Sequence, residues 1–511
     1  MRTQTQGPSG NFLAMVGLNL AGWCSWFRAG RRTAHFCLGA ALLFAAVPVA
    51  SHGQDAAKPD PKLQTSAQSA QKPTTPESQQ PGAGAQVRTG SQFGERSQGN
   101  RLMRLVEDHQ YPELERLLDA PEDAATGGPA KLTAEQKQLY RGVLANRDNK
   151  PQESIRLLQP LLDKLKSAGR TPEEKLLRKT LAEDYLRAGD LAQANQAWLE
   201  FEYRFGGGLT PDERDEIELP VRLLPLAFQF PPMTVELGGP FTLPYDRDPL
   251  GLTDVPVWVD GQSHDWMLDP TAPFNLICRT TAKEIGLNIS DEYATVHTIT
   301  GKPMRVQAAV IPRFTLGTIT YRDMTVFVFD DQDYSFPQSH YQVRGVLGYP
   351  AVSALGSLTV TAESNIEVQP GEKGERTTSG ARFFLDGDRI IAALGNAGDE
   401  RMFAVDASGQ QTYLTSRYFS EHSDEFANKK MQLLAVPGAL NKPPAPAYDA
   451  ESVTLEVGST PVTMHYIQVL TEPLGNAALD DVYGTLGMDV LDELKSYTFD
   501  YRTMRFAAKN E

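Results

Sequence analysis

The stretch Val255–Ile277 reads VPVWVDGQSHDWMLDPTAPFNLI, and it decides the fold of the larger part of the chain. Two short apolar runs, Val255–Val259 and Trp266–Leu268, are joined by a polar segment that begins with Asp-Gly. This arrangement predicts a β-hairpin, because Gly261 can adopt the positive φ that such a turn requires. The second run predicts a buried strand that delivers Asp269 at its end.

The same pattern returns at residues 402–414, MFAVDASGQQTYL, where Asp406 follows another apolar run. The separation of the two aspartates is 406 − 269 = 137 residues. A second motif is also repeated, since GVLGYPAVSALGSLTV begins at Gly345 and GTLGMDVLDELKSYTF begins at Gly484, which is 484 − 345 = 139 residues later. Two motifs repeated in the same order at nearly the same spacing predict a tandem duplication.

Both copies resemble the catalytic hairpin of the retropepsin-like (pepsin-type, two-lobed) aspartic peptidases of bacteria, in which an apolar run leads into Asp-Thr-Gly. The resemblance extends over Pro232–Phe506 and implies an all-β, acid-protease-like fold. The two copies are then lobe 1, residues 232–370, and lobe 2, residues 381–511. The resemblance also implies that Asp269 and Asp406, one from each lobe, share a proton and activate one water for peptide hydrolysis.

The residues after the two aspartates depart from the family pattern, and this leaves two functions open. In place of Asp-Thr-Gly, the chain has Asp269-Pro270-Thr271 and Asp406-Ala407-Ser408, followed by Gly409, which offers a shifted Ser-Gly pairing. The family's Thr hydroxyl braces one lobe against the other, and Pro270 and Ala407 have no hydroxyl. Thr271 and Ser408 carry a Cβ where the family's Gly lets an amide approach the carboxylate. The chain is therefore either an aspartic-type endopeptidase or an inactive pseudopeptidase that binds peptides or protein partners.

A second hairpin is expected in lobe 1, at residues 293–305. Its tip is placed near Thr300, Gly301 and Lys302, because Gly in a polar segment marks a turn. In the peptidases that the chain resembles, a hairpin so placed folds over the substrate as a flap.

Composition and motifs exclude several other classes of function. The chain has 511 residues and a net charge of −15, so nucleic acid is not an expected partner. Its eight histidines are scattered, and no His-x-x-x-His or Cys-x-x-Cys spacing indicates a metal. No phosphate-binding Gly-rich loop and no Gly-x-Ser-x-Gly is present. We therefore expect neither a metal nor another cofactor.

The first hundred residues predict export. A basic cluster, Arg28 to Arg32, precedes the apolar stretch Phe36–Ala50 and the small residues Ser51 and Gly53. This order is typical of a signal peptide at residues 1–53, and it predicts a periplasmic or secreted protein. An uncleaved leader would instead anchor the chain in a membrane. Residues 54–100 are rich in Gln, Ala, Pro and Ser and predict a disordered linker.

Residues 101–210 predict an all-α helical-repeat domain that folds independently and ends at Gly206–Gly208. A spacing of 40 residues relates Leu114, Ser154 and Ala194, and the same spacing relates Leu118, Leu158 and Trp198. The two members of each i, i+4 pair lie on one helix face. The unit LAEDYLRAGDLAQANQAW resembles a tetratricopeptide repeat, and such repeats usually present a groove to a peptide or protein partner. The alternative is a plain helical bundle that only spaces the linker from the lobes.

Overall fold

The structure is a computed structural model that describes residues 94–120, 132–167, 171–259, 261–297, 302–371, 376–396, 398–406, 409, 411–434, 444–475 and 477–509. The predicted signal peptide and most of the predicted linker lie outside these residues. Across the ranges that the structure describes, no helix is both long and apolar enough to cross a membrane.

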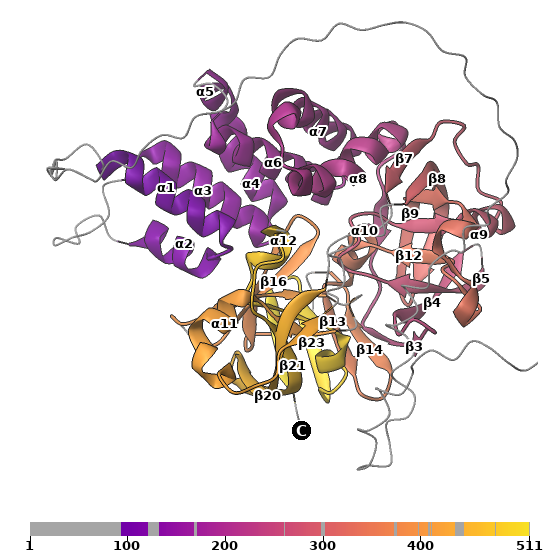
Figure 1. Cartoon of the computed structure of the whole chain (residues 1–511). Coiled ribbons are helices and arrows are strands. Elements are labelled where there is room, and N and C mark those ends of the chain that lie inside the picture. The colour runs from indigo at the N-terminus through magenta and orange to yellow at the C-terminus, as the bar shows by residue number, and fades with distance from the viewer. Residues whose placement is uncertain are drawn as a thin grey trace, which may run out of the picture. The chain divides into compact units, whose positions relative to one another are not determined.

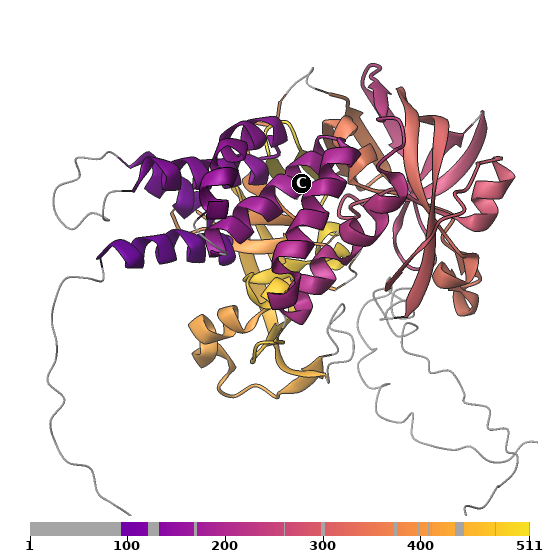
Figure 2. The ribbon, with the colours of Figure 1, turned by 90° about the horizontal axis from the view of Figure 1, so that it is seen from above.

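The first part of the described chain is helical, and we call residues 94–227 the helical region (Figures 1 and 2). Its helices are α1 Gly94–Glu107, α2 Tyr111–Asp119, α3 Ala134–Arg147, α4 Pro151–Leu158, α5 Leu162–Ser167, α6 Pro172–Arg187, α7 Leu191–Phe205 and α8 Pro211–Ala227. The positions spaced by 40 residues are buried, for Leu114 in α2, Ser154 in α4 and Ala194 in α7 are fully enclosed. The likeness to tetratricopeptide repeats stays a prediction.

Both predicted ends of the helical part are wrong. Helix α1 begins at Gly94, inside the predicted linker. At the other end, Gly206–Gly208 form only a 3-10 turn, and α8 follows it. Helix α8 starts because Thr210 caps it, with its hydroxyl accepting from the amide of Glu213 while the Glu213 carboxylate accepts from the amide of Thr210.

Lobe 1 is built from strands with two short helices. The strands are β1 Thr234–Glu236, β2 Phe241–Pro244, β3 Asp246–Arg247, β4 Thr253–Val259, β5 Gln262–Leu268, β6 Leu276–Cys278, β7 Ala294–His297, β8 Pro303–Leu316, β9 Ile319–Phe329, β10 Ser335–Phe336, β11 Tyr341–Gln342, β12 Gly345–Leu347, β13 Ser357–Thr361 and β14 Asn365–Gln369, and the helices are α9 Arg279–Glu284 and α10 Tyr349–Val352. The predicted hairpin is confirmed, since Val259 pairs with Gln262 and Gly261 has a φ of 80°.

Lobe 2 repeats this sequence of elements. Its strands are β15 Ala381–Asp386, β16 Arg389–Leu394, β17 Arg401–Val405, β18 Tyr413–Leu414, β19 Gln432–Leu434, β20 Ala445–Val457, β21 Thr460–Leu470, β22 Gly484–Leu486, β23 Ser496–Asp500 and β24 Arg505–Lys509, with helices α11 Ser416–His422, α12 Ala477–Asp480 and α13 Met488–Leu491. The C-terminal part of the chain is therefore mostly β-sheet, as predicted.

The strand pairings agree with the duplication read from the sequence. In lobe 1, β12 runs parallel to β5 and antiparallel to β6, and β6 runs parallel to β9. In lobe 2, β22 runs parallel to β17 and antiparallel to β18, and β18 runs parallel to β21. In each lobe, one short strand, β12 or β22, therefore lies between the strand that precedes the aspartate and the strand that follows it.

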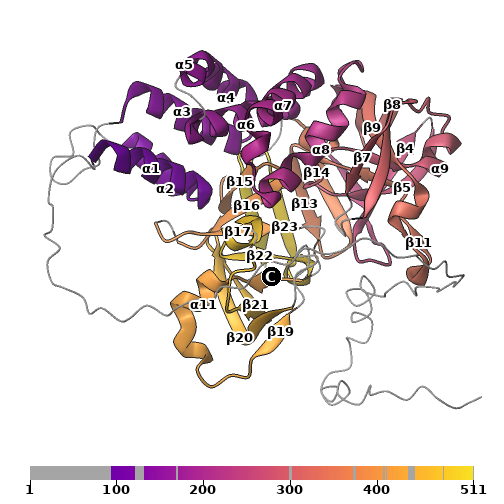
Figure 3. The same ribbon diagram turned by 45° about the horizontal axis from the view of Figure 1, so that its top comes forward.

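The two lobes share a sheet (Figure 3). Strand β13 of lobe 1 pairs antiparallel with β23 of lobe 2, from Ser357 opposite Asp500 to Thr361 opposite Ser496. Within the described residues, lobe 1 contributes β13, β14 and β2 to a thirteen-stranded sheet whose other strands come from lobe 2. One cluster of buried apolar side chains, which includes Trp266, Leu358 and Phe499, accordingly runs through both lobes.

The buried core of the helical region extends into both lobes. Leu144 of α3 and Leu177 of α6 lie in one buried cluster with Phe384 and Ile391 of lobe 2. Val221 of α8 lies in another cluster, together with apolar side chains of β7, β8 and β9 in lobe 1. Its apolar faces are thus covered partly by the lobes.

Candidate active site

Asp269 lies at the end of β5, where the parallel neighbour β12 fixes its backbone. The Asp269 amide donates to the carbonyl of Leu347 at 3.0 Å. The chain then turns, because the amide of Ala272 donates back to the carbonyl of Asp269 at 3.2 Å. The turn is held in place by the amide of Tyr349, which donates to the carbonyl of Ala272 at 2.8 Å.

Asp406 is held by the same set of bonds at the end of β17. Its amide donates to the carbonyl of Leu486 at 2.9 Å, and the amide of Gly409 donates to the carbonyl of Asp406 at 3.3 Å. The amide of Met488 in turn donates to the carbonyl of Gly409 at 2.8 Å. Each bond matches one in lobe 1, so both aspartates occupy equivalent positions in the two copies.

The repeated Leu-Gly motif is explained by a close approach of backbone. A Cβ on Gly348 would lie 2.3 Å from the carbonyl oxygen of Phe274, and one on Gly487 would lie 2.7 Å from the carbonyl carbon of Gln411. Only glycine fits at such distances. The Gly amides are also used, since Gly348 donates to Oδ1 of Asn275 at 3.0 Å and Gly487 donates to Oγ1 of Thr412 at 2.8 Å.

Asn275 and Thr412 were not identified from the sequence. Each stands six residues after its aspartate and ties the aspartate loop to the Leu-Gly strand. The side chains differ, amide in one lobe and hydroxyl in the other, so no repeated letter marks the position. The common spacing from Asp269 and Asp406 is the signal that could have found them.

Thr271 supports the Asp269 carboxylate, contrary to expectation. Its amide donates to Oδ1 of Asp269 at 2.9 Å, and its hydroxyl donates to the same oxygen at 2.6 Å. Its φ is not positive, so the Cβ causes no backbone strain. The expectation that a side chain here would keep the amide from the carboxylate is therefore wrong.

In lobe 2 the close approach is made by Gly409. Its amide donates to Oδ1 of Asp406 at 2.7 Å, and a Cβ added there would lie 2.3 Å from Oδ2 of the same carboxylate. A side chain at Gly409 would displace the Asp406 carboxylate from this bond. The shifted pairing of Gly409 with the family's Gly stays a prediction. Ala407 and Ser408 lie outside the described residues.

The two carboxyl groups act on each other. Burial raises the pKa of Asp269, the hydrogen bonds from Thr271 lower it, and the charge of Asp406 raises it, with a net pKa above the ordinary value of aspartic acid. The Asp269 carboxyl therefore lies within electrostatic reach of Asp406.

Three tyrosines sense the charges of this site, and sequence reasoning did not select them. Tyr413 and Tyr501 are buried, and Tyr334 is half-buried. Burial raises the pKa of Tyr334 and of Tyr501, and the charge of Asp269 adds to both. Burial likewise raises the pKa of Tyr413 to about 12, with a contribution from Asp406. Among the described residues, no group hydrogen-bonds to the hydroxyl of Tyr501. The three phenols are therefore neutral at neutral pH.

The predicted flap is described only in part. Strands β7 and β8 pair from Ala294 opposite Val306 to His297 opposite Pro303, which confirms a hairpin at the predicted place. Of the predicted tip residues, Thr300 and Gly301 lie outside the described residues, and Lys302 forms an ion pair with Asp333 at 3.5 Å. Pro270 is half-buried beside Asp269.

A metal site is not indicated in the ranges that the structure covers, where no three His, Cys, Asp or Glu side chains are grouped to hold an ion. The chemistry that the site offers is that of two neighbouring carboxyl groups in a partly desolvated setting. Such a pair holds one proton between its members over a wide pH range and can act as base and acid at once.

Comparison with known proteins points to the same part of the chain. Residues 255–351 match the family described as "Aspartyl protease". No curated protein matches the chain. A solved retropepsin-like aspartic protease from Rickettsia conorii shares 16% identity over 26% of this chain and 99% of that chain, with a TM-score of 0.21, a likeness too weak to carry an argument. The chain thus contains an aspartic protease-like domain, and Asp269 lies within it.

Proposed function

We propose that the protein is an aspartic endopeptidase that hydrolyses peptide bonds with water activated between Asp269 and Asp406. The ionised member of the pair takes a proton from the water as its oxygen attacks the peptide carbonyl. The protonated member gives its proton to the carbonyl oxygen. As the C–N bond breaks, the leaving nitrogen takes the proton that came from the water, and a hydroxyl of the intermediate returns a proton to the other carboxylate. No cofactor is required by this scheme.

The observation that carries the proposal is the equivalence of the two aspartate loops. The same backbone bonds hold Asp269 on Leu347 and Asp406 on Leu486, and each carboxylate accepts from an amide of its own loop. Two equivalent carboxyl groups, one from each copy, are what a shared-proton mechanism needs. The family match of residues 255–351 supports the same reading.

We assign the shared proton mainly to Asp269. Burial and the charge of Asp406 both raise the pKa of this carboxyl, which favours its protonated form. Asp406 then acts as the base. Both bonds from Thr271 reach Oδ1, so we assign the proton to Oδ2.

The test is digestion of a peptide library by the purified protein from acidic to neutral pH. Asp269→Asn and Asp406→Asn should each abolish cleavage, while the exposed Asp291→Asn, the same chemical change outside the site, should cleave like the parent. Cleavage should be fastest at acidic to mildly acidic pH, where the pair holds one proton. Cleavage that survives either active-site change contradicts the proposal. No cleavage by the parent, together with saturable binding of extended peptides, would establish the pseudopeptidase instead.

We also propose that the mature protein begins near Gln54 and is exported to the periplasm or beyond. The support is the order of basic, apolar and small residues in the leader. N-terminal sequencing of the protein from the periplasmic fraction checks this directly. An intact leader recovered with the membrane fraction contradicts it.

A further inference from the structure

The turn between α3 and α4 contacts both lobes through three consecutive residues. Arg147 pairs with Asp386 of lobe 2 at 2.8 Å, and Asp148 pairs with Arg382 of lobe 2 at 2.9 Å. Asn149 accepts a hydrogen bond at its Oδ1 from the hydroxyl of Tyr349 in lobe 1, at 2.5 Å. A single turn of the helical region thus reaches across to both halves of the β part.

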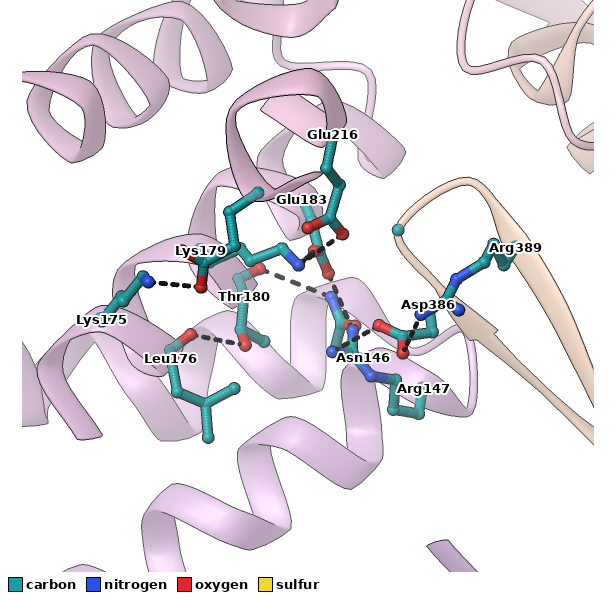
Figure 4. Close-up of polar contacts among 12 residues, drawn as sticks. Asn146, Arg147, Lys175, Leu176, Lys179, Thr180, Glu183, Glu216, Asp386 and Arg389 are labelled. Carbon is teal, nitrogen blue, oxygen red and sulfur yellow. Dashed lines mark hydrogen bonds and ion pairs between the residues drawn. The ribbon is translucent and has the colours of Figure 1, made fainter. Parts of the chain in front are cut away.

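The contact with lobe 2 is a buried charged socket. Figure 4 shows Asp386 and Arg389, on the hairpin of β15 and β16, opposite Asn146 and Arg147 of the helices. The Asp386 carboxylate accepts from the hydroxyl of Tyr111 at 2.9 Å and lies 2.8 Å from Nδ1 of His109. Arg147 is itself held from behind by Glu183 at 2.8 Å.

This buried group of charges fixes the position of the β15–β16 hairpin relative to the turn between α3 and α4. Asp386 and Arg147 are 5% and 3% exposed, and a buried charge is tolerated only when its partner and its hydrogen bonds are in place. The arginine fork further restricts the geometry, because Nη1 and Nη2 bind two different carboxylates. The hairpin of lobe 2 therefore has one position against the α3–α4 turn.

The contact with lobe 1 lies directly behind the Asp269 loop. Tyr349, whose hydroxyl reaches Asn149, also donates its amide to the carbonyl of Ala272. Ala272 in turn donates to the carbonyl of Asp269, so two residues connect the helical region to the aspartate. The Tyr349 ring also packs edge-on against Tyr501 of lobe 2, with centroids 6.3 Å apart.

We propose that residues 147–149 form a keystone that holds the two aspartate loops in register, with Asn149 and Arg147 as positioning residues for the peptidase reaction. This rests on the proposed function and extends it, because it makes the helical region part of the catalytic scaffold. Arg147 holds lobe 2 through Asp386, and Asn149 holds the Asp269 loop of lobe 1 through Tyr349. A pair of carboxyl groups that must share one water is sensitive to shifts of about 1 Å.

The test uses two mild substitutions in the full-length protein. Asn149 has a φ of 57°, so Asn149→Gly removes the side chain without straining the backbone, and Tyr349→Phe removes only the hydroxyl. Each should lower kcat about tenfold or more and leave KM nearly unchanged, because the dyad is misaligned while the substrate still binds. Since both remove one bond, the double variant should lose no more than the worse single variant.

Matched controls separate this effect from general damage. Asn288→Gly, in an exposed loop, and Tyr466→Phe, at a 75% exposed side chain, should leave kcat unchanged. Arg147→Lys keeps the charge but cannot bind two carboxylates as a fork, and it should lower kcat in the same way. Additive losses, or losses confined to KM, overturn the keystone.

A second readout does not depend on activity. Hydrogen–deuterium exchange of residues 269–275 should be faster in Asn149→Gly and in Tyr349→Phe than in the parent. The double variant should exchange no faster than the faster of the two single variants. Exchange as slow as in the parent overturns the keystone even if cleavage is normal. If the parent cleaves no peptide but exchange rises as expected, the keystone stands and the proposed peptidase function alone fails.

Discussion

Thr271 gives Asp269 both its amide and its hydroxyl, and the two bonds lower the pKa of a carboxyl that burial raises. Thr271→Val removes the hydroxyl alone, so we expect the pKa of Asp269 to rise and kcat to fall about tenfold, as for one lost hydrogen bond. Thr271→Ser keeps the bond and should match the parent. The pH dependence of kcat checks this, and equal behaviour of the Val and Ser variants contradicts it.

The charge of Asp406 raises the pKa of Asp269, and this can be measured without catalysis. In Asp406→Asn the charge is absent, so Asp269 should titrate at lower pH than in the parent. Carbon-13 NMR of the labelled carboxyl groups follows this titration directly. Asp291→Asn serves as the control and should leave it in place; an Asp269 titration that does not move in Asp406→Asn would show that the two carboxyl groups do not interact.

At the scale of residues, the sequence predicted the two repeated aspartates, but it did not predict the groups that support them, which differ between the lobes. Asp269 and Asp406 follow alike apolar runs and could be aligned. The support of each carboxylate could not be, because lobe 1 uses the Thr271 hydroxyl and amide whereas lobe 2 uses the Gly409 amide three residues on. Different residues make equivalent hydrogen bonds in the two lobes, so an alignment of the two sequence repeats does not reveal them.

Helix α6 carries a buried carboxyl whose titration opposes folding at neutral pH. Asp184 is fully buried, accepts from Nδ2 of Asn146 at 2.7 Å, and burial raises its pKa from 3.8 to about 7. Its folded-state pKa lies above the unfolded one, so its stabilising effect is complete below pH 3.8 and is lost as pH rises through about 7. A shift of this size corresponds to about 4 kcal/mol at most.

Asp184→Asn should therefore unfold at higher urea concentration than the parent at pH 8, and the advantage should shrink towards pH 4. Asparagine stays neutral, so the cost of ionising a buried carboxyl disappears. Asp163→Asn, on the exposed face of α5, is the control and should change neither midpoint. A parent and an Asp184→Asn variant with parallel pH profiles would contradict the assignment.

At the scale of elements, strands were easier to predict than helix ends. The hairpin of β4 and β5 follows from alternating apolar runs around Gly261. Helix α8 was missed because three glycines precede it and Pro220 and Pro225 lie within it, all of which disfavour helix locally. The burial of its apolar face against lobe 1 stabilises the helix by more than these residues destabilise it. Such a tertiary contact cannot be predicted from the local sequence.

The whole molecule should unfold in one step. The lobes share the sheet formed by β13 and β23, and the helical region shares buried clusters with both lobes. Calorimetry is therefore expected to give one transition for the helical region and lobes together. Two well-separated transitions, with helix lost in one and sheet in the other, would contradict this and restore the independent helical domain predicted from the sequence.

At this scale the duplication predicted the two lobes but not what holds them. Arg147 and Asp386 are 386 − 147 = 239 residues apart, and a charged residue in a helix or a turn is most often a surface residue. Their pairing in a buried socket depends on both folded partners at once. No local sequence pattern predicts such a contact, and for this reason the helical region was predicted to fold independently of the lobes.

The shared sheet also has a consequence for the order in which the protein is made. Strand β13 is completed at Thr361, yet its partner β23 begins only at Ser496, which is 496 − 361 = 135 residues later. A chain still under synthesis or in transit already contains both aspartates, but it lacks the strand that joins the lobes carrying them. The protein is therefore expected to cleave nothing in the cell that makes it until β23 has been synthesised. A chain stopped at Leu494 should accordingly cleave no peptide, and cleavage by that chain would contradict the expectation.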